Sequence, residues 1–408
     1  MNKTEKKLIP ELRFPEFVKD GEWEENIVSQ VAEYENGKAH EQDIAEKGKY
    51  VVVNSKFIST DGEVRKYSNA ANCLAKKNEI LMVLSDVPNG RAIAKCFYVD
   101  KNDFYTVNQR ICKLTPVNAD GKLLFYLLNR NQFFLAFDDG VKQTNLRNAD
   151  VLSCPIILPK NIKEQQKIAS CLSSLDELIA AHNDKLQALK DHKKGLMQNL
   201  FPQKGQKVPN YRFPEFEKDG EWVEKKLEKT CELNPRVGEL PDEFVYVDLE
   251  SVSKGLLLKK NIIKKKDAPS RAQRLLQDND VIYQMVRPYQ KNNYYFIGSD
   301  GYNYVASTGY AQLRAFDSSI FLFQLIHTDR FVSSVLEKCT GSNYPAINSN
   351  ALKQIEVQIP PSINEQQKIA SCLSTLDELI TAQAEKIEQL QQHKKGLMQG
   401  LFPKNVNV

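Results

Sequence analysis

The stretch EQQKIASCLSSLDELIAAHNDKLQALKDHKKGLMQNLFPQ, residues 164–203, decides the fold because the chain contains it twice. Residues 365–404 read EQQKIASCLSTLDELITAQAEKIEQLQQHKKGLMQGLFPK, identical at 28 of 40 positions at an offset of 201. A shorter pair precedes each copy: RFPEF and KDGEW occur within residues 10–23 and again within 209–222, at an offset of 199. Two copies of so long a unit indicate an internal duplication and not a solenoid, whose repeats are much shorter.

Apolar residues in both long blocks recur in steps of 4 and 3, the spacing of a coiled-coil heptad. The expected seam residues are Ile168, Leu172, Leu175, Ile179, Leu186, Leu189, Ile369, Leu373, Leu376, Ile380, Ile387 and Leu390. His182 and Lys193 interrupt the first stripe, and Gln383 and Lys394 interrupt the second at the same places. Flanking prolines predict two helices of roughly 37–40 residues. Each stripe packs either on the other helix or on its own globular neighbour.

Connectivity predicts the direction of the helix pair. If the segment between the helices is compact, the second helix starts near the end of the first and runs back, so the pair is antiparallel. The two ends of the chain then come close together. Between the constant blocks lie two variable segments, residues 26–150 and 225–350, of similar length and nearly unlike sequence. Only faint echoes survive: Asn78-Glu-Ile-Leu against Asn279-Asp-Val-Ile, Gly140 against Gly341, and Ile157-Leu-Pro159 against Gln358-Ile-Pro360.

The variable segments mix short apolar runs with turn residues and predict small α/β domains. The expected strands are 50–53, 79–84, 244–248 and 280–286, and the expected helices are 121–137 and 319–338. The predicted fold class is therefore α/β (α+β), with two small globular domains separated by a long antiparallel two-helix coiled coil and an internal pseudo-two-fold repeat. The predicted division is 1–160 for the first domain, 161–203 for the first helix, 204–361 for the second domain and 362–408 for the second helix.

Composition excludes several classes of protein. No apolar run in the 408 residues approaches a membrane-spanning length, and the N-terminus lacks the apolar core of a secretion signal. The eight cysteines are scattered, which argues against a zinc ribbon or a redox pair and favours free thiols in a reducing cytoplasm. His192 and His393 recur in the two helices, but no other ligands lie at metal-binding spacing. Nucleotide-binding, methyltransferase, nuclease and hydrolase motifs are missing, so we expect a binding subunit without catalytic residues, metal or cofactor.

Clusters of basic and amide side chains in the variable segments suit DNA, because cations bind phosphates and Asn, Gln and Arg bind base edges. The candidates in the first segment are Asn54, Ser55, Arg65, Lys66, Arg91, Asn108, Gln109, Arg110, Lys142, Gln143, Asn145 and Arg147. Those in the second are Lys254, Lys259, Lys260, Ser270, Arg271, Arg274, Arg287, Tyr289, Ser342, Asn343 and Tyr344. Lys264–Lys266 suit phosphate contacts better than base contacts. The alternative is a solvated basic face, with individual residues serving as caps and turns.

The repeated RFPEF motif has two interpretations. It binds partner subunits, or each aromatic pair closes the core of its own domain.

The variable–constant–variable–constant layout resembles the specificity (S) subunit of bacterial type I restriction–modification enzymes. The resemblance covers essentially the whole chain and is most specific in the paired E-Q-Q-K-I-A-x-x-L-x-x-L-D-E-L-I blocks. Residues 269–282, PSRAQRLLQDNDVI, with Val286-Arg-Pro288 after them, also match a run common in target recognition domains of this family. The first segment keeps only Asn78-Glu-Ile-Leu of that run, so the two segments are expected to have different targets.

The resemblance implies a function. Two target recognition domains each read one half of a bipartite, asymmetric double-stranded DNA site, and the helices set the spacer between the halves. The helices also dock two methyltransferase (M) subunits, which carry S-adenosylmethionine, and restriction (R) subunits with ATP- and Mg-dependent activity join that cytoplasmic complex. The chain itself would hold no cofactor. Two rival functions stay open: a self-contained restriction–methylation enzyme, and a coiled-coil adaptor that does not bind DNA.

Overall fold

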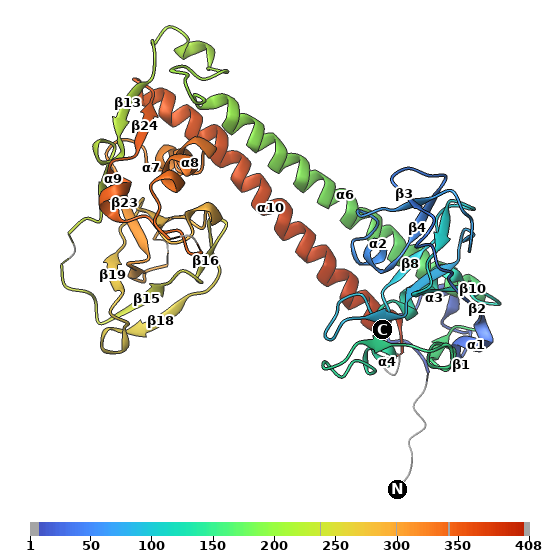
Figure 1. Ribbon diagram of the computed structural model, residues 1–408. Helices are drawn as coiled ribbons and strands as arrows, with labels where there is room; N and C mark the ends of the chain where they lie inside the picture. The colour runs from blue at the N-terminus through green and yellow to red at the C-terminus, as the bar shows by residue number, and fades with distance from the viewer. Residues whose placement is uncertain (1–7, 237, 299, 342, 404–408) are drawn as a thin grey trace. The chain divides into compact units, whose positions relative to one another are not determined.

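The computed structural model describes residues 8–236, 238–298, 300–341 and 343–403, which form two compact units (Figure 1). Unit 1 holds the residues up to Asn183 together with those from Lys386 on, and unit 2 is Asp184–Glu385. Both boundaries fall inside the long helices α6 (Ile162–Leu200) and α10 (Ile363–Leu401). Each unit therefore combines one globular domain with the first part of one long helix and the last part of the other.

Unit 1 contains two four-stranded sheets. The antiparallel sheet has the order β2-β10-β6-β8, and the second has the order β3-β5-β4-β9, in which β4 and β9 run parallel. The strands are β2 (Ala32–Asn36), β3 (Ile44–Ala45), β4 (Tyr50–Val53), β5 (Tyr67–Ser68), β6 (Ile80–Val83), β8 (Cys96–Tyr98), β9 (Tyr105–Val107) and β10 (Ile111–Pro116). Strands β4, β6 and β9 are buried along their whole length, which explains the apolar runs without alternation in β4 and β6.

Unit 2 repeats this plan. The sheet β14-β23-β20-β21 corresponds to β2-β10-β6-β8, and β18-β15-β22 corresponds to β5-β4-β9, again with one parallel pair. Strand β19 extends this second sheet. The strands are β14 (Cys231–Leu233), β15 (Glu243–Val247), β18 (Asn261–Lys264), β19 (Ala272–Leu275), β20 (Val281–Gln284), β21 (Tyr294–Tyr295), β22 (Tyr304–Ser307) and β23 (Tyr310–Ala315). The four strands expected from the sequence are thus confirmed, and the unlike segments share one scaffold.

Short elements complete each unit. Two-stranded pairs are β1 (Glu24–Ile27) with β12 (Pro155–Leu158), β7 (Ser85–Asp86) with β11 (Thr144–Asn145), β13 (Val223–Lys226) with β24 (Glu356–Ile359), and β16 (Val252–Ser253) with β17 (Leu256–Leu257). Short α-helices are α1 (Val28–Val31), α2 (Ser55–Ser59), α3 (Gly121–Leu128), α4 (Gln132–Leu135), α5 (Asn148–Leu152), α7 (Ser319–Leu325), α8 (Asp329–Glu337) and α9 (Ser349–Lys353). Single-turn 3-10 helices are η1 (Pro15–Phe17), η2 (Pro214–Phe216), η3 (Leu227–Lys229), η4 (Lys265–Asp267) and η5 (Pro288–Gln290).

Two helix predictions were wrong in one respect: each segment expected to form one helix forms two shorter helices. Residues 121–137 form α3 and α4, with Arg130 in the left-handed region at φ 59° and the Asn131 side chain accepting the Phe133 N–H at the start of α4. Residues 319–338 form α7 and α8, with the Thr328 side chain capping α8 through the Phe331 N–H. A capping side chain offers the backbone an alternative to continuing the helix, so the apolar pattern runs on while the helix stops.

The long helices are 39 residues each and pair antiparallel within each unit. In unit 1 the Lys394 Nζ lies 2.5 Å from an Asp176 carboxylate oxygen, and in unit 2 the Lys193 Nζ lies 2.5 Å from one of Asp377. The two lysines that interrupt the apolar stripes are therefore the partners of matching ion pairs between the helices. Antiparallel pairing follows, because late residues of one helix meet early residues of the other.

Both interpretations of the apolar stripe hold, each for a part of it. Ile168 and Leu172 lie in the core of the unit 1 domain together with Leu401 and Phe402 from the end of α10. The equivalent positions of unit 2 do the same, with Ile369 and Leu373 beside Leu200 and Phe201. Leu376, Ile387 and Leu390 are also buried, and Leu175, Ile179, Leu186, Leu189 and Ile380 are half-buried. The starts of the helices thus belong to the domains, and the later seam residues to the helix pair.

Candidate nucleic-acid interface

The first candidate interface lies at the carboxyl ends of the parallel strands β4 and β9. Neighbouring parallel strands end at one edge of a sheet, so the residues that follow them converge. They form a hollow of about 510 Å³. Its lining is His40, Glu41, Ile44, Val52, Asn54, Ser55, Lys56, Lys66, Asn108, Gln109 and Arg110. Six predicted candidates from three separate segments therefore meet in one place: Asn54, Ser55, Lys66, Asn108, Gln109 and Arg110.

Hydrogen bonds fix the rim of this hollow. The Asn54 side chain accepts the Phe57 N–H at 2.9 Å and so caps α2, and the Asn108 N–H donates to the Val53 carbonyl at 3.0 Å. The Gln109 amide donates to the Glu41 carboxylate at 2.9 Å. A side chain at Gly37 would place its Cβ 2.1 Å from the Asn108 carbonyl oxygen, so only glycine permits this approach.

The hollow is basic. Lys56, Lys66 and Arg110 are exposed, and among the described residues none of them has an ion pair or a side-chain hydrogen bond. The one carboxylate in the lining, Glu41, is engaged by Gln109. Three free cations beside fixed amide groups suit an anionic polymer with hydrogen-bonding edges, as DNA is.

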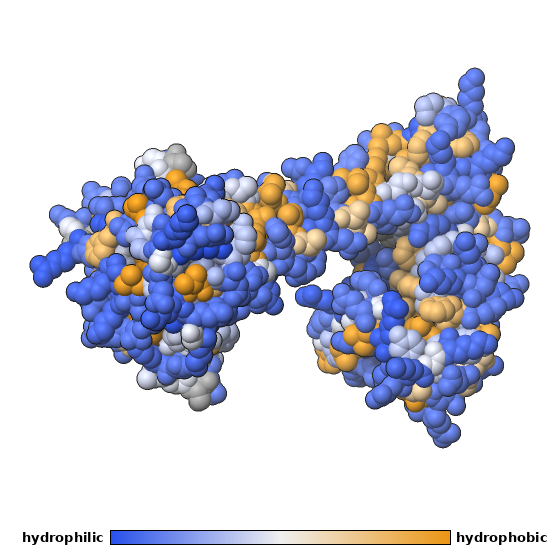
Figure 2. All heavy atoms as spheres, turned by 90° about the horizontal axis from the view of Figure 1, so that it is seen from above, coloured by the Kyte–Doolittle hydropathy of each residue, from blue (hydrophilic) through white to orange (hydrophobic). Residues whose placement is uncertain are grey.

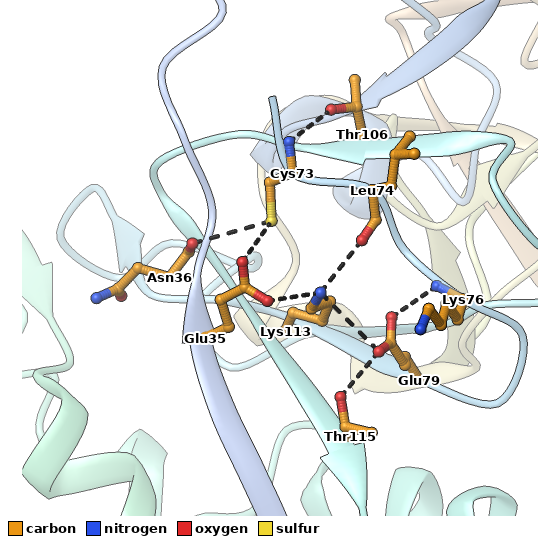
Figure 3. Close-up of polar contacts among 9 residues, drawn as sticks. All are labelled: Glu35, Asn36, Cys73, Leu74, Lys76, Glu79, Thr106, Lys113 and Thr115. Atoms are coloured by element: carbon orange, nitrogen blue, oxygen red, sulfur yellow. Dashed lines mark hydrogen bonds and ion pairs between the residues drawn. The ribbon is translucent and has the colours of Figure 1, made fainter. Parts of the chain in front are cut away.

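A polar network joins the two sheets of unit 1 (Figure 3). Lys113 on β10 reaches Glu35 on β2 at 2.6 Å and donates to the Leu74 carbonyl at 3.2 Å. The neighbouring Cys73 N–H donates to the Thr106 hydroxyl on β9 at 3.3 Å, and that hydroxyl is 2.8 Å from Nε2 of the buried His40. The network thus ties both sheets of unit 1 to a residue of the hollow.

The same network explains the faint sequence echo between the segments. Asn78 and Asn279 both have positive φ, at 75° and 71°, and each precedes a buried acid that opens a central strand. Glu79 lies 3.9 Å from Lys113, and Asp280 makes two 2.9 Å hydrogen bonds with Arg314, the residue 201 positions after Lys113. The echo therefore has a structural role in both units: the acid that follows each asparagine lies beside a basic residue of the neighbouring strand.

The other candidates of unit 1 do not line the hollow. Arg65 donates to the Gly62 carbonyl at 2.9 Å, and the exposed Arg147 binds Asp150, its neighbour on α5, at 3.1 Å. Lys142, Gln143 and Asn145 follow Gly140 in a loop that packs on the loop containing Arg91. The Asn89 amide joins these loops by donating to the Gly140 carbonyl at 3.1 Å.

In unit 2 the strand-end position carries different residues. The Thr308 N–H, after β22, donates to the carbonyl of the exposed Arg271 at 2.8 Å, and Ser270 is exposed beside it. Arg274 on β19 is half-buried, and its Nε has no partner among the described residues; burial lowers the pKa of this guanidinium. Lys259 and Lys260 pair with Glu250 and Asp300, whereas the exposed Lys254 has no side-chain partner within the described ranges.

A second pair of loops gathers the remaining candidates of unit 2. The Arg287 guanidinium lies over the ring of Tyr344, 4.3 Å from its centre, and Tyr289 is exposed nearby in sequence on η5. Asn343 is exposed in the same loop as Tyr344, and Ser342 lies outside the described residues. The loops after Gly140 and Gly341 occupy equivalent places in the two units, since each packs on the loop after the central strand β6 or β20.

Sequence reasoning missed His40, Glu41 and Lys56. Lys56 directly follows Asn54 and Ser55 after a predicted strand, and that adjacency was a usable signal. His40 and Glu41 reach the hollow only through tertiary structure. The described residues contain no group of His, Cys, Asp and Glu that could hold a metal ion.

The RFPEF motif contacts its own domain: Phe14 and Phe213 pack against the cores of their units, and the arginine of each motif binds a long helix. The Arg13 guanidinium makes two hydrogen bonds, of 2.7 and 2.8 Å, to Glu164 at the start of α6, and the Trp23 indole donates to the same carboxylate at 3.3 Å. In unit 2, Arg212 and Trp222 bind Glu365 in the same way. The two blocks that recur in the sequence therefore bind each other in both units.

Residues 20–191 and 221–392 each match the model of the type I restriction modification DNA specificity domain. The chain belongs to this family. Membership makes it a DNA-specificity subunit, a non-catalytic component of type I systems, which confirms the function that the resemblance implied. Subunits of this family bind DNA and assemble with other subunits of the type I system.

Known specificity subunits resemble this chain over most of its length. The MjaVIII specificity subunit of Methanocaldococcus jannaschii is 23% identical, with 97% of this chain and 95% of the relative aligned. The putative MjaX specificity subunit of the same organism is 24% identical over 76% of this chain and 74% of its own. The crystal structure of the S subunit from M. genitalium has the same fold, with a TM-score of 0.64, 16% identity, and coverage of 97% and 99%. Within the described ranges, no helix is long and apolar enough to cross a membrane.

Proposed function

We propose that each globular domain of this specificity subunit reads one half of a bipartite DNA site. Residues 1–160 form the first recognition domain and residues 204–361 the second. The observation that carries the proposal is one scaffold with different chemistry at equivalent positions: Asp86 and Gln143 in the loops of unit 1, and Arg287 stacked on Tyr344 in the matching loops of unit 2. Equal scaffolds with unlike side chains suit two unlike half-sites.

We further propose that the helices set the spacer between the half-sites and dock two M subunits, one on each repeat. Leu178 on α6 and Leu379 on α10, 201 positions apart, expose 43% and 49% of their surface although both lie in long helices, and apolar residues also reach the surface along the helical region in the space-filling view (Figure 2). Repeated apolar residues left exposed at equivalent positions fit two like partner contacts. S-adenosylmethionine would come with the M subunits, and ATP and Mg with R subunits, in a cytoplasmic complex.

Adenine methylation mapped by single-molecule sequencing tests this function. Cells would express the chain with its cognate M subunit, the M subunit alone, or the chain alone. We expect a new bipartite methylated motif only when both proteins are present. A mark made by the chain alone would show an enzyme, and no mark with a verified active M subunit would favour the adaptor.

Binding measurements separate DNA recognition from a pure adaptor role. The complex should bind its site with an affinity that falls steeply with salt, because neutralised phosphates release counterions. Lys56→Ala, Lys66→Ala and Arg110→Ala together should reduce the slope of log K against log salt by up to about 3. The control variant Lys19→Ala, which removes an exposed lysine outside the hollow, should leave the slope unchanged.

A further inference from the structure

The loop pair of unit 2 holds an arginine in an unusual and fixed conformation. Arg287 has φ 54° and ψ 54°, a left-handed backbone conformation that residues other than glycine rarely adopt. Such conformations cluster at functional sites. Its N–H donates to the Pro345 carbonyl at 2.7 Å, and its guanidinium stacks on Tyr344 at 4.3 Å. Among the described residues no carboxylate forms an ion pair with Arg287.

The loop that carries Tyr344 is also fixed. Thr340 and Ala346 exchange two backbone hydrogen bonds of 2.9 and 3.0 Å at its base, and Ala346 bridges Val286. Tyr344 itself is 64% exposed, so the stacked pair is held from behind and open in front.

Unit 1 places different chemistry at the equivalent positions. Ser85 pairs with Asn145 as Val286 does with Ala346, an offset of 201 on both sides, so Arg287 corresponds to Asp86 and Tyr344 to Gln143. The Asp86 carboxylate turns onto its own loop and accepts the N–H groups of Ala92 and Ile93 at 2.6 and 3.0 Å. The Gln143 amide donates to the Ser85 hydroxyl at 2.6 Å. The position of the free cation Arg287 thus carries a carboxylate, Asp86, in unit 1, and the position of Tyr344 carries a neutral amide, Gln143.

We infer that Arg287, stacked on Tyr344, reads a guanine in the half-site of the second domain. The inference rests on the proposed function and names one of its reading residues. A guanidinium presents a rigid fork that matches the O6 and N7 acceptors of guanine in the major groove. Stacking on an aromatic face leaves the edge of the fork free and removes the freedom that an unsupported arginine would lose on binding. A phosphate contact needs no such fixed aim.

Methylation of a randomised DNA pool by the full chain with its cognate M subunits tests the inference. Arg287→Ala should make one G·C pair of the second half-site degenerate, with discrimination there falling about 5- to 150-fold. Arg287→Lys should relax the same position, because a lysine keeps the charge and loses the fork. Tyr344→Leu should relax that position more weakly. The first half-site and the spacer should stay unchanged in all three variants.

Lys254→Ala serves as a matched control, since this exposed lysine of unit 2 has no aromatic support among the described residues; it should slow methylation of all sequences alike. An unchanged motif with Arg287→Ala overturns the inference. So does an equal loss at every sequence that Arg287→Lys restores, because that pattern marks a phosphate contact. Thermal midpoints of the variants report folding. A wild-type complex that makes no bipartite mark overturns the proposed function itself, before any variant is compared.

Discussion

At the scale of single residues, one buried carboxylate fastens each long helix to its domain. Glu164 and the Arg13 side chain that binds it expose only 1% and 7% of their surfaces. Their bond raises the pKa of Arg13, chiefly through the hydrogen bonds with Glu164. The duplicate pair of Arg212 and Glu365 is equally buried. Removing one partner of such a pair leaves the other charge buried and unpaired.

Glu164→Gln should therefore destabilise unit 1 strongly, by about 3–5 kcal/mol. Chemical unfolding followed by circular dichroism would measure the loss. Glu16→Gln is the matched control, because Glu16 pairs with Lys167 at the exposed surface, where solvent screens the pair, so this substitution should leave the stability nearly unchanged. Equal effects of the two substitutions would contradict the assigned role of Glu164.

Asp300 provides a pH-dependent contribution to stability. Hydrogen bonds from Lys260 and then Tyr304 lower the pKa of Asp300 to about 2. A carboxyl group whose folded pKa is depressed stabilises the fold above its unfolded pKa, about 3.9, and loses that effect as the pH falls through the folded value. The Tm difference between wild type and Lys260→Met should thus be constant above about pH 5 and shrink toward pH 2. A difference that does not change with pH would refute this linkage.

The sequence could not reveal these pairings. Arg13 and Glu164 are each visible as repeated residues, but their contact spans 151 positions and depends on the folded domain. Part of the hollow could be predicted as polar residues that follow a strand, because the valines of β4 identify that strand in the sequence. His40 was not predictable there, since the hydrogen bond to Thr106 that places it depends on the pairing of β9.

At the scale of elements, the spacing of apolar residues was sufficient to predict the bounds of the long helices but not those of the short ones. The predicted lengths of α6 and α10 are confirmed, because four turns or more of regular spacing and flanking prolines leave little choice. The breaks at Arg130 and Thr328 were missed, because apolar periodicity continues through them while local capping bonds stop the helix. A capping side chain stops a helix through a hydrogen bond to a residue two or three positions ahead. The periodicity of apolar residues gives no sign of that bond.

Two helical glycines offer a direct test of element stability. A Cβ atom added at Gly195 in α6 or at Gly396 in α10 would meet no atom within 4 Å. Alanine at either site should stabilise the chain by roughly 0.5–1 kcal/mol, because glycine loses more backbone freedom in a helix. Gly400→Ala is the contrasting variant: its Cβ would lie 2.6 Å from Leu12 Cδ1, so it should not stabilise and should lower the Tm. Thermal unfolding of the three single variants would check the order.

At the scale of the whole molecule, both long helices pass without a break from one unit into the other. We expect that inserting four residues after Asn183 and four after Glu385 lengthens both helices by about 6 Å. Both insertions leave the ion pairs between the helices intact, because the two partners of each pair belong to the same unit and the insertions lie at the boundary between the units. The unread spacer should grow by one or two base pairs at about 3.4 Å each, with both half-sites unchanged.

Methylation sequencing would report the spacer directly. An insertion in only one helix is the control, and should reduce activity instead of changing the spacer, since the two helices then differ in length. Altered half-sites with an unchanged spacer would contradict the proposed role of the helices.

The hydrogen bond between the Leu12 N–H and the Gly400 carbonyl, 2.8 Å long, brings the two ends of the chain together in unit 1. Its counterpart in unit 2 joins Tyr211 to Asn199 at 3.0 Å, and there an ordinary loop connects the same two elements. The same junction between a long helix and the start of a domain thus occurs twice. The chain is continuous across it in unit 2 and not in unit 1. A circular permutant that links Pro403 to Leu8 and is cut between Gln203 and Val208 should keep the cores of both units and lose only local contacts of the cut loop, such as the hydrogen bond between Gln203 and Gln206. It would reverse the order in which the domains are synthesised while leaving their recognition of DNA unchanged.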